Sequence, residues 1–366
     1  MNNKLNSLAL AITLALSANA QVQAAPLSLE VIGTHTTGIF DEGAAEIVAH
    51  DARNQRIFKI NANAVAVEVL DINDPENPSL MGTIDAGNLG GGANSVAIYK
   101  DLVAVAIEAE VAQDPGLVAF YDSTDLSLIG TVDVGALPDM VTFTPNGRYV
   151  LVANEGEPDD DYKVDPEGSI SIIDLRHGVG SASVRTADFN AWDGNEDELR
   201  AEGVRIFGPG ASTSQDLEPE YITVANNSRT AWVAMQEANA LAVVDIKSAT
   251  VTDILPLGAK DHNLPGNELD ASNRDGSINI TNWPVKGFYM PDAITSYNID
   301  DTTYIVSANE GDSRDYDGFS EEERIKDLVL DPVAFPDAAT LQEDENLGRL
   351  NSTTVNGDID GDGDFD

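Results

Sequence analysis

A pattern of apolar segments and turns repeats five times along the 366-residue chain. Each copy opens with a polar or acidic residue, which is followed by an apolar segment, a turn and a second apolar segment. The copies begin near Glu46, Asn94, Asp139, Glu220 and Asp292. Their apolar residues alternate with other types or are β-branched, which is typical of strands and not of helices. The chain must therefore fold as a series of similar β units.

Two further segments complete each of the first four copies. A third segment ends in aspartate, as at residues 169–174, and a fourth reads Leu-Ile-Gly-Thr-Val-Asp at residues 128–133. Four short strands in a unit of about 40–50 residues are typical of a β-propeller blade. We predict an all-β propeller with four complete blades and a fifth that has begun. A general β-sandwich is the alternative, and the constant order of segments within each copy argues against it.

Residues 29–34 match the pattern of a fourth strand, although no first three strands precede them. Propellers commonly close their ring by completing the last blade with a strand from the other end of the chain, which removes open edges. We therefore predict that this segment is a closing strand. The blade that it would complete should lie beyond residue 366, so we expect the chain to be a truncated propeller.

Residues 1–25 have the features of a secretory signal peptide. Lys4 gives a positive start, residues 8–16 are apolar but too short to span a bilayer, and small residues follow. No later stretch is long and apolar enough to span a membrane. We expect the protein to be exported, to the periplasm, the cell surface or the medium, with residues 26–366 forming the propeller.

Three insertions interrupt the blades, at residues 175–218, 259–290 and 311–366. The first contains a short predicted helix around residues 196–202. In the third, Ser320 and Glu323 have the spacing of a capping box, which predicts a helix over the apolar residues that follow. Long loops on a rigid scaffold are where binding sites usually lie.

The chain is strongly acidic, with 63 Asp and Glu against 20 Lys and Arg and a net charge of −43. Such a surface repels phosphate backbones, which excludes nucleic acid as a partner, and it disfavours anionic lipid. Cysteine is absent, which excludes disulfides, thiolate metal sites and cysteine nucleophiles. Four histidines without HExxH spacing disfavour a zinc hydrolase. Oxygen ligands remain, and these favour calcium, or else magnesium.

Acidic residues recur at fixed positions of the repeat. Asp139, Glu220 and Asp292 begin the innermost strand of their blades. Glu155 and Glu310 follow the second strand, in the matching motifs Ala-Asn-Glu-Gly-Glu and Ala-Asn-Glu-Gly-Asp. Antiparallel pairing brings the start of one strand near the end of the next, so we expect these carboxylates to converge on one mouth of the channel and to bind a cation. The alternative is that each of them caps a turn within its own blade.

The C-terminal residues predict a calcium loop. Residues 358–363 read Asp-Ile-Asp-Gly-Asp-Gly, in which oxygen ligands alternate along the chain and glycine occupies the sixth position. Asp358, Asp360 and Asp362 are the expected ligands, and Asp364 follows them. The sequence reaches the ninth position of this loop, before the bidentate acid that is usual at the twelfth.

Four motifs together resemble the choice-of-anchor I domain family, at residues 137–140, 152–158, 216–222 and 307–312. The resemblance covers roughly residues 27–366. It implies a secreted or surface-anchored propeller, seven-bladed when complete, with a variable C-terminal anchor. The family includes proteins similar to a mesenchyme-specific cell-surface glycoprotein and bacterial members named as alkaline phosphatases, and it does not imply one activity.

Two functions fit these observations. The first is a calcium-binding propeller outside the cell, monomeric when complete, that binds an extracellular ligand or a surface polymer. The second is a metal-dependent phosphomonoesterase at the channel mouth, where Glu155 and Glu310 would be catalytic or hold metal and Arg314 would contact phosphate. The chain contains no GxSxG motif, P-loop or dinucleotide fingerprint. We favour binding over catalysis, because an acidic surface opposes the approach of an anionic substrate.

Overall fold

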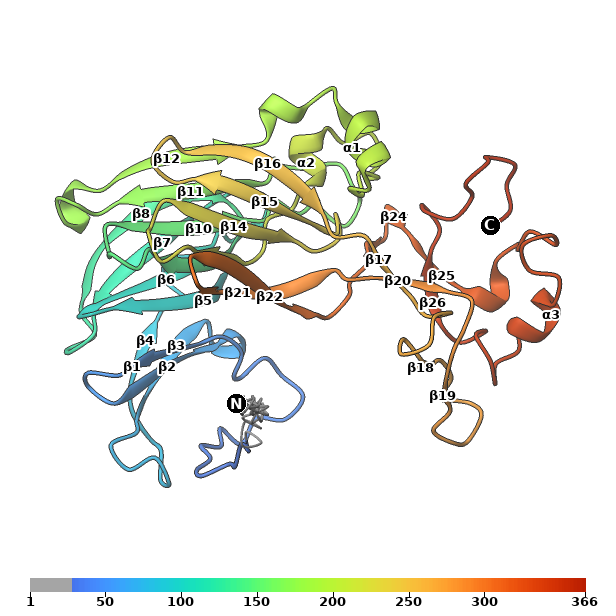
Figure 1. Ribbon diagram of the computed structural model, residues 1–366. Helices are drawn as coiled ribbons and strands as arrows, with labels where there is room; N and C mark the ends of the chain where they lie inside the picture. The colour runs from blue at the N-terminus through green and yellow to red at the C-terminus, as the bar shows by residue number, and fades with distance from the viewer. Residues whose placement is uncertain (1–27) are drawn as a thin grey trace, which may run out of the picture.

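The computed structural model describes residues 28–366, whose regular secondary structure is mostly β (Figure 1). The predicted signal peptide lies outside the described residues and stays a prediction. Within the described part, four sheets each contain four antiparallel strands in sequence order. The first two sheets consist of β1 (Val48–Asp51), β2 (Arg56–Asn61), β3 (Ala66–Asp71) and β4 (Ser79–Asp85), and of β5 (Gly92–Tyr99), β6 (Leu102–Glu108), β7 (Pro115–Asp122) and β8 (Leu128–Ala136).

The third and fourth sheets have the same form. They consist of β9 (Pro138–Phe143), β10 (Tyr149–Asn154), β11 (Ser169–Asp174) and β12 (Ser183–Asp188), and of β13 (Ile222–Val224), β14 (Thr230–Met235), β15 (Ala240–Asp245) and β16 (Thr250–Pro256). Each predicted start of a blade lies within a few residues of an observed first strand. The prediction of four complete four-stranded blades is confirmed.

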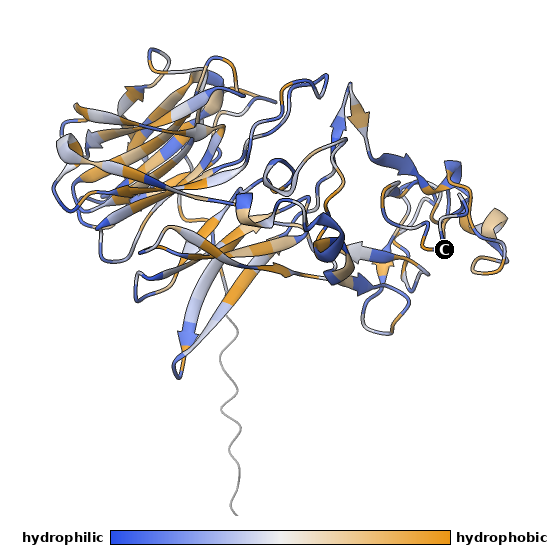
Figure 2. Ribbon diagram, turned by 90° about the horizontal axis from the view of Figure 1, so that it is seen from above, coloured by the Kyte–Doolittle hydropathy of each residue, from blue (hydrophilic) through white to orange (hydrophobic). Residues whose placement is uncertain are grey.

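Consecutive sheets pack face to face. Successive side chains of a second strand point alternately into the core on one face of the sheet and the core on the other. In β10, Val150 and Val152 belong to the core shared with the second blade, and Leu151 and Ala153 belong to the core shared with the fourth. The second strand of blade two divides its side chains in the same way. The first strands β1, β5, β9 and β13 contact one another in that order, as they do around the axis of a propeller. Apolar residues are concentrated on these stacked strands, and the loops are largely polar (Figure 2).

The fifth unit is a two-stranded ladder of β21 (Pro291–Ile299) and β22 (Thr302–Asn309). One of its faces packs on the fourth blade through Ile294, which contacts the core around Ala234 and Leu241. On its other face Tyr297 and Tyr304 stack with ring centroids 5.3 Å apart, and both rings are exposed. The fifth blade is therefore begun with two strands, as predicted.

The N-terminal closing strand is not formed. Residues 29–34 are irregular, and Leu29 remains 90% exposed. Gly33 instead lies against the backbone of Pro75, in the turn between β3 and β4, where a side chain would clash. The segment pairs with no strand in residues 28–366. The expectation that it closes a last blade of a longer propeller stays a prediction.

The predicted helix in the first insertion is confirmed as α1 (Glu196–Glu202), and α2 (Thr213–Asp216) follows it. The predicted helix after Ser320 is wrong. Those residues form β24 (Phe319–Ser320), β25 (Glu322–Arg324) and a 3₁₀ turn at Ile325–Asp327. The Ser320 hydroxyl accepts the Glu322 N–H, and β25 pairs with β26 (Asn351–Thr353), so long-range strand pairing replaces the local capping box.

The second and third insertions fold together as one lobe, defined here as residues 259–290 and 311–366. Ala271 and Trp283 from one insertion share a core with Ile325, Leu341 and Leu347 from the other. The lobe also contains β17 (Ala259–Asp261), β18 (Leu269–Asp270), β19 (Ile280–Thr281), β20 (Lys286–Phe288), β23 (Asp315–Tyr316) and α3 (Ala338–Leu341). It lies beside the stacked blades, to the right in Figure 1. From the sequence we predicted two separate insertions, whereas in the structure they share one hydrophobic core.

Across residues 28–366, no helix has the length and apolar character needed to cross a membrane.

The stacking of blades predicts the effect of truncating a side chain between them. We expect Leu151→Ala to lower the free energy of unfolding by about 2–5 kcal/mol, because Leu151 is fully buried between blades three and four. Leu128→Ala in β8 is the matched control, since this leucine is half exposed and should cost less than about 1 kcal/mol. Chemical denaturation of both variants measures the difference, and equal losses would contradict the stacking.

Candidate functional site: carboxylates at the channel mouth

The starts of the first strands and the ends of the second strands meet at one end of the blades. In blade three, Asn154 at the end of β10 pairs with Pro138 at the start of β9, which places Asp139 near Glu155. In the fifth unit, Asn309 pairs with Pro291, which places Asp292 near Glu310. The carboxylates of Asp292 and Glu155 both interact electrostatically with other members of this group. We call this end of the blades the channel mouth.

Burial and like charge together raise the pKa values at the mouth. Burial raises the pKa of Asp139 to about 7, and the nearby carboxylates of Asp292 and Glu157 add to the shift. Burial, followed by the charges of Glu157 and Asp139, raises the pKa of Glu155 well above its usual value. Asp292 has a smaller increase in pKa, from burial and from Glu310. The ionisation of each of these carboxylates therefore depends on the charge of the others.

Three buried or half-buried glutamates at the mouth were not predicted as site residues. Glu218 and Glu237 are almost fully buried, and Glu157 is half buried. Burial raises the pKa of Glu218 well above its usual value, although Arg314 opposes this. Burial also raises the pKa of Glu157, whose Oε1 accepts a 3.0 Å hydrogen bond from the Tyr316 hydroxyl. We define the mouth cluster as Asp139, Glu155, Glu157, Glu218, Glu220 and Glu237.

The sequence held a partial signal for these three residues. Glu157 and Glu218 lie inside the motifs that surround Glu155 and Glu220. Glu237 follows Gln236, which occupies the repeat position of Glu155 in blade four. The turn between β14 and β15 shifts the acid of this blade by one residue, so a strict alignment of the repeats misses it.

Arg314 does not face the mouth as a free cation. Its guanidinium is 2% exposed, forms an ion pair with Asp216, and lies 2.8 Å from Oε2 of Glu218. The group also stacks 4.6 Å from the centre of the Phe207 ring. Glu310, the other predicted catalytic candidate besides Glu155, is exposed. Arg314 is therefore held by protein carboxylates that a phosphate would have to displace.

A second buried arginine lies against the same aromatic ring. Arg205 stacks 4.3 Å from the Phe207 ring centre and forms an ion pair with Glu321. Its Nε also donates a 2.8 Å hydrogen bond to Oδ1 of Asn356. Arg205 belongs to the first insertion, whereas Glu321 and Asn356 belong to the lobe. The two arginines and Phe207 thus join the lobe to the blades beside the mouth cluster.

The C-terminal loop gathers its predicted ligands. Carboxylate oxygens of Asp358, Asp360 and Asp362 lie within 4.8 Å of one another, and all three residues are exposed. Asp358 accepts backbone N–H groups of Gly361 at 2.7 Å and Gly363 at 3.1 Å, which wraps the loop around its carboxylate. Such a triad could bind a metal ion.

Asp364 belongs to a different triad from the other predicted ligands of the loop. Its carboxylate lies within 4.8 Å of those of Asp331 and Asp366. Asp331 was not predicted, because it lies far away in the sequence; the bridge between Leu330 and Phe365 brings it to the C-terminal residues. Among the described residues, three acidic side chains approach this closely only in these two triads and not in the mouth cluster.

With this geometry in place, comparison with known proteins identifies the family. The model of the choice-of-anchor I domain matches residues 46–366. The chain belongs to this family. No functionally curated protein matches the sequence.

Solved structures share part of the architecture with this choice-of-anchor I domain. They include the hydrazine synthase of Kuenenia stuttgartiensis, with a TM-score of 0.35 and 11% identity over 58% of this chain and 74% of that one. The Cps50 (Swd1) β-propeller domain of Myceliophteria thermophila has a TM-score of 0.41 and 9% identity over 59% and 57% of the two chains. A chain of a nidogen/laminin complex has a TM-score of 0.38 and 12% identity over 59% and 65%. No functional conclusion is based on these distant similarities.

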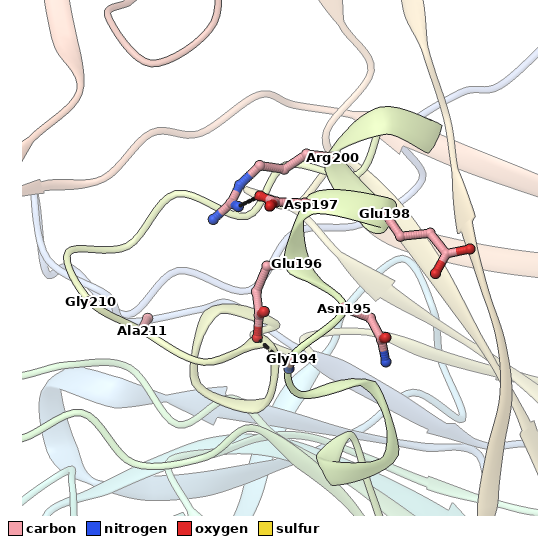
Figure 3. A pocket seen from close by; sticks show the side chains of 8 residues that line it. All are labelled: Gly194, Asn195, Glu196, Asp197, Glu198, Arg200, Gly210 and Ala211. Atoms are coloured by element: carbon pink, nitrogen blue, oxygen red, sulfur yellow. Dashed lines mark hydrogen bonds and ion pairs between the residues drawn. The ribbon is translucent and has the colours of Figure 1, made fainter.

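A hollow on the first insertion is also acidic, but its side chains are already partnered (Figure 3). Oε1 of Glu196 accepts the Gly194 N–H at 2.9 Å, and Asp197 lies 2.8 Å from Arg200. These contacts fold the start of α1. The hollow is therefore a weaker candidate for a site in the choice-of-anchor I domain than the mouth cluster.

The raised pKa values predict how stability changes with pH. A carboxyl whose pKa is higher in the folded than in the unfolded state retains its proton on folding, so stability is lost as pH rises through that window. For Asp139 the window runs from about 4 to the folded value of about 7. In chelator, we expect the free energy of unfolding to fall as pH rises from 5 to 7, by up to about 1.4 kcal/mol per pH unit for one such group. Asp139→Asn should flatten the profile, and an unchanged slope would contradict this assignment.

Removing the guanidinium of Arg314 should be costly. We expect Arg314→Met to destabilise the domain by about 3–5 kcal/mol, because it leaves Asp216 and Glu218 buried without a counter-ion. Arg53→Met is the control, since the Arg53–Asp101 pair is solvent-exposed and should contribute less than about 1 kcal/mol. Urea denaturation measures both losses. Similar losses for the two variants would show that the buried ion pairs of Arg314 contribute no more to stability than the exposed pair of Arg53.

Proposed function

We propose that this choice-of-anchor I domain is a calcium-binding propeller outside the cell, which binds an extracellular ligand or surface polymer. The observation that carries the proposal is the exposed triad of Asp358, Asp360 and Asp362, with carboxylate oxygens within 4.8 Å of one another. These acids occupy the first, third and fifth positions of a loop whose sixth residue is Gly363, as in known calcium loops. The net charge of −43 and the predicted signal peptide also support a role in a calcium-rich extracellular setting.

Calcium fits this loop better than other cations. The ligands are all carboxylates on a flexible turn, which suits the large and adaptable coordination shell of calcium more than the strict octahedron of magnesium. With no cysteine in the chain and no histidine in either triad, soft transition metals are disfavoured. A bound ion would also reduce the repulsion between the two triads, which share the C-terminal segment.

The phosphomonoesterase hypothesis has less support. It required Arg314 to meet a phosphate, and this guanidinium is buried against Asp216 and Glu218. It also required carboxylates that hold two metal ions in a site open to substrate, and the close triads of the described residues lie in the C-terminal region instead. Binding remains the function that the geometry supports best.

Calcium should stabilise the folded chain at fixed ionic strength. A cation that binds only the folded form adds about 2.7 kcal/mol when its concentration is a hundred times the dissociation constant. We expect the melting temperature to rise in millimolar calcium relative to chelator, with sodium chloride adjusted to match. The double variant Asp360→Asn, Asp362→Asn should lose much of this rise.

The control for this experiment is Asp300→Asn, Asp301→Asn, which removes two charges from the exposed turn between β21 and β22. It should keep the full response to calcium. If the loop variant responds as strongly as the control, the loop is not the calcium site, and if neither the native chain nor the control responds, calcium binding should be abandoned.

A further inference from the structure

Two glutamates at the channel mouth form a buried pair. Glu220 and Glu237 are 6% and 7% exposed, and the charge of Glu237 is among the causes that raise the pKa of Glu220, so the two carboxyls are neighbours. Glu220 lies two residues before the first strand of blade four, and its N–H donates a 3.0 Å hydrogen bond to the carbonyl of Ala234. Glu237 lies in the turn after the second strand of the same blade. Backbone pairing within one blade therefore holds the two carboxyls together.

One oxygen of this pair is left without a partner. Oε2 of Glu237 is buried and makes no hydrogen bond to any described residue. Burying an unsatisfied polar atom costs about 1–3 kcal/mol, and more when the group is charged. A bound ion or an ordered water is one way in which a native structure satisfies such an atom.

The neighbouring arginines are already engaged. Arg314 pairs with Asp216 and Glu218, and Arg205 pairs with Glu321. No ion pair within residues 28–366 reaches Glu220 or Glu237. The half-buried carboxylate of Glu155, from blade three, adds further negative charge beside Glu220. The pair therefore has no ion-pair partner of its own, although the charge of Arg314 lowers the pKa of Glu237.

We propose that Glu220 and Glu237 bind a divalent cation, calcium in the first instance, at the channel mouth. Two neighbouring carboxylates provide up to four oxygens, and calcium accepts six to eight, so water can complete the shell. This explains how a site can exist although three acidic side chains do not approach within 4.8 Å there. The ion would join the start of the first strand of blade four to the turn after its second strand.

Calorimetric titration of calcium into the metal-free chain tests this site. We expect Glu237→Gln to remove one equivalent of bound calcium or to weaken it by roughly 10- to 100-fold or more, because loss of even a supporting group of a metal site has that effect. Glu198→Gln, at an exposed position of α1, is the matched control and should bind as the native chain does. Asp360→Asn, Asp362→Asn should retain the equivalent that depends on Glu237, so failure at the loop and failure at the mouth are distinguishable.

Near-ultraviolet circular dichroism in chelator checks that the variants are folded. Glutamine is isosteric with glutamate and removes a buried charge, so we expect Glu237→Gln to fold. If it does not fold, Glu220→Gln is the second variant. Calcium binding with unchanged stoichiometry and affinity in a folded variant of either residue would overturn the proposal, as would a native chain whose bound calcium is lost entirely in the loop variant. Magnesium as the titrant should bind more weakly, and equal affinity would overturn the choice of calcium.

Discussion

The charge balance around Arg314 determines how the acidic end of this domain can pack. One guanidinium, 2% exposed, satisfies Asp216 and Glu218 and stacks on Phe207. An isolated buried charge costs many kcal/mol, so each of these groups is tolerated only because the others are present. Arg314 comes from the lobe and its partners come from the first insertion, so the same contacts that neutralise the carboxylates also dock the lobe. Arg205 and the hydrogen bond from Tyr316 to Glu157 add to this docking.

The blades themselves depend on a simpler constraint. The second, third and fourth sheets are each packed on both faces, and their inner strands therefore need apolar residues at consecutive positions and not only at alternate ones. The second strand of blade three, Val150–Ala153, is fully buried along its length for this reason. The polar residues that such strands cannot carry are displaced to their ends. This concentrates acids at the mouth, where the strand ends of several blades meet.

Repetition made the blades predictable, because each strand pattern occurs several times and each copy supports the interpretation of the others. The lobe was not predictable in this way. Its core joins Trp283 to Ile325 and Leu347, which lie in different insertions and carry no repeated pattern. The capping box at Ser320 failed for the same reason, since strand pairing with residues 351–353 is a long-range contact that local spacing does not encode. Residues 29–34 show the opposite failure. Their sequence has the pattern of a strand, but they pair with no strand in the described residues.

The candidate sites also differ in whether their residues are close in sequence or are brought together only by folding. The triad of Asp358, Asp360 and Asp362 was predictable because its members are neighbours in sequence, whereas Asp331 and Glu237 join their clusters only through folding. The two kinds of cluster also differ in what they require. Exposed aspartates such as Asp360 can be solvated by water when no ion is present, so the folded chain does not depend on their ligand. Glu237 has no such alternative, because its unpartnered oxygen is buried. The ion proposed at the channel mouth would therefore meet a need of Glu237 that water does not meet, whereas the exposed loop can be hydrated when it holds no ion.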